Sequence, residues 1–116
     1  YTENHLYLVD GEFTTVDAKL SKNGKLEWST VLASPLGGGL KGMFMLDITE
    51  PDAGLSDLRS NLFKWEITEK TKIDTEKVYK RMGFIINPPK IVRFRIPDDA
   101  SNPNKYHDKW VLLAGN

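Results

Sequence analysis

Few residues in this chain have the type and spacing that chemistry requires. The segment Asp98–Asn104 is rich in the carboxylate and amide oxygens that bind calcium. It lacks the alternating acids, the turn glycine and the distal glutamate of a calcium loop, so we interpret it as a solvated turn. His5 and His107 stand alone, without a second histidine or acid at i+3 or i+4, and no serine lies in a nucleophile elbow. The sequence therefore predicts no catalytic, cofactor or metal site.

Asp47 is the acid most strongly placed for burial, because it follows four apolar residues and precedes Ile48 and Thr49. Burial would raise its pKa, whereas its position between a strand and a turn favours hydrogen bonds from turn amides. We favour the second, structural role.

A basic stripe of Lys90, Arg93 and Arg95 lies on one predicted strand, but Asp98 and Asp99 follow at once. No aromatic residue interleaves on that face for base stacking, which indicates a solvated sheet face and no nucleic-acid partner. The 16 basic and 16 acidic residues balance, so the chain has no global field that would attract phosphate backbones.

The length of 116 residues suits one domain, predicted over residues 1–116. No cysteine is present, which excludes disulfides and thiolate metal sites. The longest apolar run is far below the roughly 20 residues of a membrane-spanning helix, and no export signal opens the chain. Because the sequence begins at Tyr1 and stops after an apolar strand, we expect an excerpt of a longer protein.

Period-two patterning predicts an all-β chain of antiparallel sheets. The clearest strand is Asn61–Thr68, where Phe63, Trp65 and Ile67 share one face. Gly42–Ile48 and Lys109–Ala114 are apolar on both faces and are predicted to be central strands. Further strands are predicted at His5–Val9, Glu12–Val16, Leu26–Ala33 and Lys90–Ile96, one short helix at Asp74–Met82, and a surface loop at Pro97–Asp108.

Three tryptophans, Trp28, Trp65 and Trp110, recur 37 and 45 residues apart, each next to charged and apolar residues. A recurrence near 40 residues in an all-β chain is typical of propeller blades of four strands each. The spacing predicts a partial β-propeller of two to three blades. Three core tryptophans in an ordinary antiparallel sandwich are the alternative.

The segment Trp28–Pro51 resembles the signature of the PilC/PilY family of type IV pilus tip-associated proteins. That signature runs W-x-T-V-L-V, then G-A-G-G-x-G, and then an apolar strand that ends A-L-D-V-T-x-P. Other segments resemble family motifs in the same order, namely Tyr7–Gly11, Leu62–Glu66, Met82–Phe84, Pro88–Val92 and Lys109–Asn116. The structural residues of these motifs are Trp28, Gly37, Gly38, Gly39, Gly42, Asp47, Thr49, Pro51, Trp65, Gly83, Trp110, Gly115 and Asn116. The chain departs from the family pattern at 56–61 and 70–77, where extra charged residues occur, and in the loop at 97–108.

The resemblance implies a piece of the C-terminal β-propeller of an exported bacterial protein at the cell surface, outer membrane or pilus tip. It implies a role that is not enzymatic, in pilus assembly, retraction control and surface adhesion, with pilins, assembly proteins and host-surface molecules as partners. It leaves calcium to other parts of the parent protein. We also expect the fragment to self-associate through blade faces such as that of Phe63, Trp65 and Ile67.

A second class of propeller, the quinoprotein dehydrogenases, carries a tryptophan-docking repeat of the form A-x-D-x-x-x-G-x-x-x-W. Ala18, Gly24 and Trp28 fit that frame, but Leu20 occupies the aspartate position. We keep an excerpt of such a propeller as the alternative function.

Overall fold

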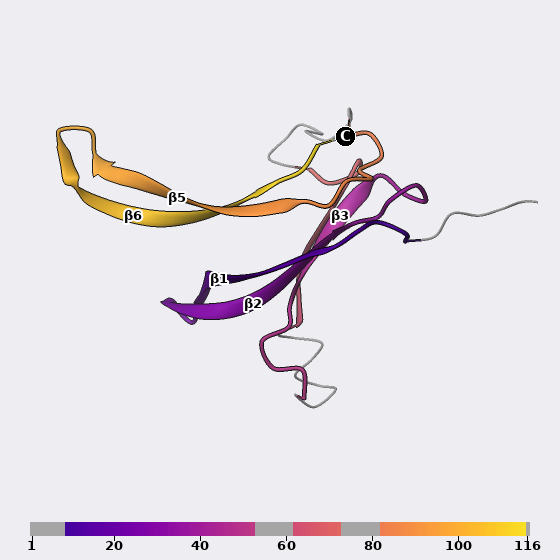
Figure 1. Ribbon diagram of the computed structural model, residues 1–116, viewed down its shortest axis with the longest axis horizontal. Helices are drawn as coiled ribbons and strands as arrows, with labels where there is room; N and C mark the ends of the chain where they lie inside the picture. Colours follow the sequence, from indigo (N-terminus) through magenta and orange to yellow (C-terminus); the bar gives the residue numbers. More distant parts are fainter. Residues whose placement is uncertain (1–8, 53–61, 73–81, 116) are drawn as a thin grey trace, which may run out of the picture.

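All the elements in the described part of the chain are antiparallel strands. The computed structural model describes residues 9–52, 62–72 and 82–115. Figure 1 shows a sheet of β1 to β4 and a separate long hairpin of β5 and β6. The strands are β1 (Thr14–Lys22), β2 (Lys25–Pro35), β3 (Gly42–Asp47), β4 (Phe63–Thr68), β5 (Lys90–Asp99) and β6 (Asn102–Leu113). The prediction of an all-β chain with antiparallel sheets is confirmed, and the open sheets are consistent with a partial propeller.

β1 and β2 form a hairpin closed by the Asn23–Gly24 turn. Both turn residues have positive φ, 50° and 79°, as the tight turns of two-residue hairpins require. The ladder runs without a register shift from Lys22 opposite Lys25 to Thr14 opposite Ala33. Both strands are longer than predicted at Glu12–Val16 and Leu26–Ala33, because the turn extends the ladder into charged sequence whose side chains reach solvent.

β3 lies between β2 and β4, which confirms the prediction of a central strand at Gly42–Ile48. Its apolar residues face neighbours on both sides of the sheet, which is typical of an inner strand. The ladder between β3 and β4 shifts register between Met45 and Leu46. β4 starts at Phe63, two residues after the predicted start, and ends at Thr68 as predicted.

The prediction of a surface loop at Pro97–Asp108 is wrong, because these residues form the distal half of the β5–β6 hairpin. Asp99 and Asn102 accept backbone N–H groups from Ser101 and Asn104, at 2.9 and 3.3 Å, and so form the turn. Cross-strand side-chain contacts extend the ladder despite the prolines, since a proline is tolerated where a strand has a free edge. Within the described residues β6 pairs with β5 alone, so its predicted central position is not found there.

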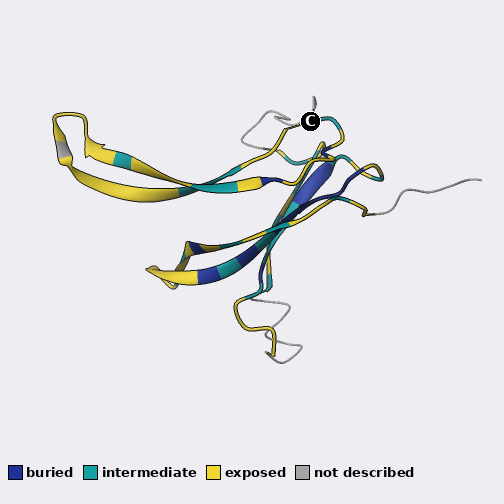
Figure 2. Ribbon diagram, in the orientation of Figure 1, coloured by how far each residue is buried: buried dark blue, intermediate teal, exposed yellow. Residues whose placement is uncertain are grey.

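The hairpin contacts the four-stranded sheet through a pair of tryptophans. The rings of Trp28 in β2 and Trp110 in β6 lie 6.0 Å apart at an interplanar angle of 73°. Toward its tip the hairpin is mostly exposed, whereas burial concentrates on β2 and β3 (Figure 2). The buried apolar residues are Ala18, Val31, Ala33, Leu36, Met43 and Ile85.

The strand predicted at His5–Val9 and the helix predicted at Asp74–Met82 lie almost wholly outside the described residues. Within the described residues, the structure contains no helix long and apolar enough to cross a membrane.

Candidate functional site

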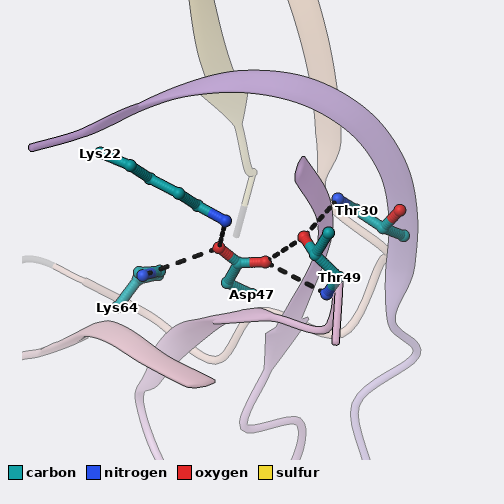
Figure 3. Close-up of polar contacts among 5 residues, drawn as sticks. All are labelled: Lys22, Thr30, Asp47, Thr49 and Lys64. Carbon is teal, nitrogen blue, oxygen red and sulfur yellow. Dashed lines mark hydrogen bonds and ion pairs between the residues drawn. The ribbon is translucent and has the colours of Figure 1, made fainter. Parts of the chain in front are cut away.

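Asp47 is the centre of a polar cluster that joins all four strands of the sheet (Figure 3). We call Asp47, Lys22, Lys64, Thr30 and Thr49 the Asp47 cluster. One carboxylate oxygen lies 2.9 Å from Nζ of Lys22 at the end of β1 and 3.7 Å from Nζ of Lys64 in β4. The other oxygen accepts hydrogen bonds from the backbone N–H of Thr49, at 3.1 Å, and from its hydroxyl. The expected hydrogen bond from a turn amide is therefore present.

Thr49 extends the cluster to β2. Its hydroxyl oxygen accepts the backbone N–H of Thr30 at 3.0 Å, and the Thr30 carbonyl accepts the N–H of Ile48 at 2.8 Å. The Thr30 hydroxyl in turn donates to Asp17 in β1 at 2.7 Å. The turn after β3 is therefore fastened to the neighbouring strand by side-chain as well as backbone hydrogen bonds.

The protonation of Asp47 follows from these contacts. Burial, with only 8% of the residue exposed, opposes ionisation and by itself would raise the pKa. The hydrogen bonds from Thr49 and Lys22 and the charge of Lys22 outweigh burial and hold the pKa of Asp47 below its ordinary value. Asp47 is thus an ionised anchor, and a carboxylate bound in this way is poorly suited to donate or abstract a proton near neutral pH.

The glycine turn of the motif contains Gly37, Gly38 and Gly39. Oδ1 of Asp10 accepts the backbone N–H of Gly38 at 2.7 Å. Gly37 has a φ of 70°, and a Cβ atom there would collide with the Asp10 side chain and the Gly11 backbone. The structure therefore brings Asp10 and Gly11, the described end of one sequence motif, against the glycine turn of another.

Gly42 begins β3 where the sheet leaves no room for a side chain. A Cβ atom at this position would lie 2.6 Å from the Ile67 carbonyl oxygen and 2.9 Å from Leu36 Cδ1. A glycine is therefore needed at position 42 because the backbone of β4 lies too close for a side chain, and not because of an unusual backbone conformation.

None of the three tryptophans is fully buried. Trp28 is 57% exposed, with the Lys19 ammonium 5.2 Å from its ring centroid, while Trp65 and Trp110 are half-buried. Of the other motif residues, Pro51 is exposed, Gly83 is half-buried, Gly115 is exposed, and Asn116 lies outside the described residues.

The structure brings in residues that sequence reasoning did not select, namely Asp10, Lys22, Thr30 and Lys64. Asp10 precedes a glycine in a recognised motif, which is a usable signal. The sequence gives no such signal for Lys22 and Lys64, because their pairing with Asp47 depends on the strand order.

The oxygen-rich segment, His107 and the basic stripe all make side-chain contacts within the β5–β6 hairpin. Asp98 lies 2.6 Å from Nδ1 of His107 across the hairpin, and Asp108 lies within 4 Å of Arg93 and Arg95. The Arg95 guanidinium also lies 3.9 Å from the Tyr106 ring centroid. No group of three or more potential metal ligands occurs in the parts of the chain that the structure describes.

Comparison with known proteins gives relatives of one kind. No family model matches the chain, and no solved structure matches it. The type IV pilus biogenesis factor PilY1 of Pseudomonas aeruginosa (strain UCBPP-PA14) is 28% identical over 112 residues, and a PilY1 homolog of Xylella fastidiosa (strain Temecula1 / ATCC 700964) is 33% identical over 112 residues. A further match to a PilY1 homolog of Xylella fastidiosa is 49% identical over 47 residues, or 40% of this chain.

The two longer matches cover 97% of this chain but only 7% and 6% of the relatives. The shorter match covers 4% of its relative. The predicted resemblance is thereby confirmed, and over nearly its whole length the chain is homologous to a short segment of the type IV pilus biogenesis factor PilY1.

Proposed function

We propose that this chain is a β-propeller module of a type IV pilus biogenesis protein and that its role is not enzymatic. The observation that carries the proposal is the similarity to PilY1 proteins over 97% of the chain. The proposal extends to an exported parent protein at the cell surface, outer membrane or pilus tip. There it acts in pilus assembly, retraction control and adhesion, with pilins, assembly proteins or host-surface molecules as partners.

The arrangement of the strands supports a propeller blade. The sheet has the order β1-β2-β3-β4, in which each strand pairs with the next, as in a four-stranded blade. On the face of the sheet that carries Trp28 and Phe63, large apolar side chains remain accessible, since Trp28 is 57% and Phe63 50% exposed. In a complete propeller neighbouring blades cover such faces, and in the isolated fragment the same faces favour self-association.

The chemistry of the site supports a structural role. Asp47 is paired, ionised and tied to a turn, and the motif glycines serve close backbone contacts. Recognition then depends on segments that connect the strands at the rim of the blades, because loops on a rigid scaffold vary most freely. Two such segments expected from the sequence, 53–60 and 69–82, lie largely outside the described residues. The β5–β6 hairpin, the longest projecting element described, belongs to the same proposed rim.

The alternative of a quinoprotein propeller gains no specific support from the residues that the structure describes. Ala18, Gly24 and Trp28 lie in one hairpin, but Trp28 packs against Lys19 and Trp110.

The test is a chimera in which this chain replaces the matched segment of PilY1 in Pseudomonas aeruginosa. A chimera that restores surface pili and twitching to a strain without PilY1 supports the proposal. The matched control carries Gly37→Ala and Gly42→Ala, which we expect to break the sheet and abolish complementation. A stable, exported chimera without pili would contradict the proposed role.

A further inference from the structure

β1 is an open edge of the four-stranded sheet within the described residues. Folded proteins usually protect such edges with short strands, prolines, bulges or charged side chains, lysine above all. Of these devices β1 has the charged side chains, such as Asp17 and Lys19. β1 has nine residues, no proline and no register shift against β2. The opposite edge, β4, has six residues and a register shift in its ladder, and β5 and β6 contain Pro97 and Pro103. β1 is thus the long, regular edge of the described structure.

The hydrogen bonds of Thr30 show which peptide groups β1 presents outward. Thr30 lies opposite Asp17 in the ladder of β1 and β2. Its backbone N–H nevertheless donates to the Thr49 hydroxyl, and its carbonyl accepts the N–H of Ile48, both on the β3 side. Thr30 and Asp17 are therefore a pair without mutual backbone hydrogen bonds, and the peptide groups of Asp17 point away from β2. By the same alternation, those of Thr15, Lys19 and Ser21 also point outward.

The side chains of β1 alternate as clearly as its peptide groups. Val16, Ala18 and Leu20 lie on the more buried face, while Asp17 and Lys19 are exposed on the other. An antiparallel strand added to this edge would therefore meet an apolar stripe on one face and an acid and a base, two residues apart, on the other. Opposite charges directly across a ladder stabilise it, and like charges destabilise it.

We propose that the outer edge of β1 is a strand-addition site for an extended segment of a partner protein. The segment pairs antiparallel with β1 and bears an acid and a base two residues apart in the order Asp/Glu-x-Lys/Arg. Reversal of direction places its base opposite Asp17 and its acid opposite Lys19. Main-chain hydrogen bonds supply affinity, and the two charge pairs fix the register.

The position of the β5–β6 hairpin favours a single segment over a second copy of the chain. β5 lies close to β1 without pairing with it, and the hairpin diverges from β1 toward its tip (Figure 1). One added strand occupies only the edge itself. A second copy would have to bring its whole sheet and hairpin past β5 and β6. The proposal depends on the fold alone and holds whatever the role in pilus biogenesis.

β1 itself has the required pattern, so a peptide with the sequence of residues 14–22 is the probe. The matched control peptide has the acid and the base exchanged, with the same composition and net charge. We expect the probe to bind about tenfold more tightly than the control, measured by fluorescence anisotropy with the label on the peptide. The doubly substituted chain Asp17→Lys/Lys19→Asp should reverse this preference, although it lacks the contacts of Asp17 with Thr30 and of Lys19 with Trp28.

The location is checked by amide hydrogen exchange. Bound probe should slow exchange at the N–H groups of Asp17 and Lys19. Equal affinity for the two peptides, no binding of either, or protection confined to β4 or β5 would overturn the proposal. Light scattering that shows a dimer of the chain alone, which the probe dissociates, would overturn it in favour of a second copy. If the double variant is not folded by circular dichroism, the two peptides on the wild-type chain decide.

Discussion

At the scale of single residues, Asp47 is the side chain with the most ion pairs and hydrogen bonds in the described structure. Its carboxylate contacts the first and fourth strands through Lys22 and Lys64 and the turn through Thr49. A buried carboxylate loses hydration, so it stabilises the fold only while these partners remain. The sequence singled out this aspartate by its place after an apolar strand, but not the lysines that compensate its charge.

Asp47→Asn tests this anchor and should lower the free energy of unfolding by about 1–2 kcal/mol at neutral pH, because it removes charged hydrogen bonds. The gap to wild type should close in acid. Since the fold lowers the pKa of Asp47, the folded state favours the ionised form. Its contribution is present above the ordinary value of 3.8 and is lost as the pH falls below that value through the folded pKa. Urea unfolding between pH 7 and pH 2 measures the gap.

Glu66→Gln is the matched control, because Glu66 is exposed on β4. It should change stability by less than about 0.5 kcal/mol at neutral pH. An Asp47→Asn gap that stays constant into acid would show that the ion pairs contribute nothing, and packing would then account for the loss.

At the scale of elements, the glycine turn between β2 and β3 depends on a contact with the segment that precedes β1. Asp10 caps the Gly38 amide, and Gly37 provides both the positive φ and the space that the Asp10 and Gly11 segment occupies. Gly37 is therefore required both by the conformation of the turn and by the contact with Asp10 and Gly11, which are distant in sequence.

Gly37→Ala should destabilise the chain by about 1–3 kcal/mol, because alanine is strained at positive φ and its methyl group would displace Asp10. Thermal unfolding followed by circular dichroism measures the loss. Gly115→Ala is the matched control, since a Cβ atom there meets nothing within 4 Å. Equal melting temperatures for the two variants would contradict a stabilising contact between the glycine turn and the segment of Asp10 and Gly11.

β4 and the β5–β6 hairpin show which strands could be predicted from the sequence and which could not. β4 was recognised because Phe63, Trp65 and Ile67 alternate with polar residues. The outer half of the β5–β6 hairpin was missed because prolines, asparagines and aspartates favour loops. Arg95 over Tyr106 and Asp98 beside His107 overcome that preference, and such cross-strand partners are visible only once the register is known.

At the scale of the whole molecule, the sheet and the hairpin are joined through few described contacts. The edge-to-face contact of Trp28 and Trp110 is prominent among them. The described structure extends over 65 × 37 × 27 Å, which is elongated for a chain of this length. Large apolar side chains such as Trp28 and Phe63 are exposed in the described structure.

A double-mutant cycle tests the junction. Trp28→Ala and Trp110→Ala should show a coupling free energy of about 0.5–1.5 kcal/mol, the range of aromatic pairs beyond their buried area. Chemical unfolding of the wild type, both single variants and the double variant provides the four values. Trp65→Ala combined with Trp110→Ala is the control pair, for which we expect additive losses. Additivity in the Trp28 and Trp110 cycle would mean that the hairpin is held by other contacts.

The sequence by itself determined the all-β class, most of the strands and the kinship with PilY1, because strand periodicity and motif order are properties of neighbouring residues. The tertiary structure alone decided which charges meet Asp47, that Asp10 closes the glycine turn, and that β1 is an open edge among the strands that the structure describes. These features depend on strand order and register. Both are set by the packing of residues far apart in the chain, which local sequence patterns do not encode.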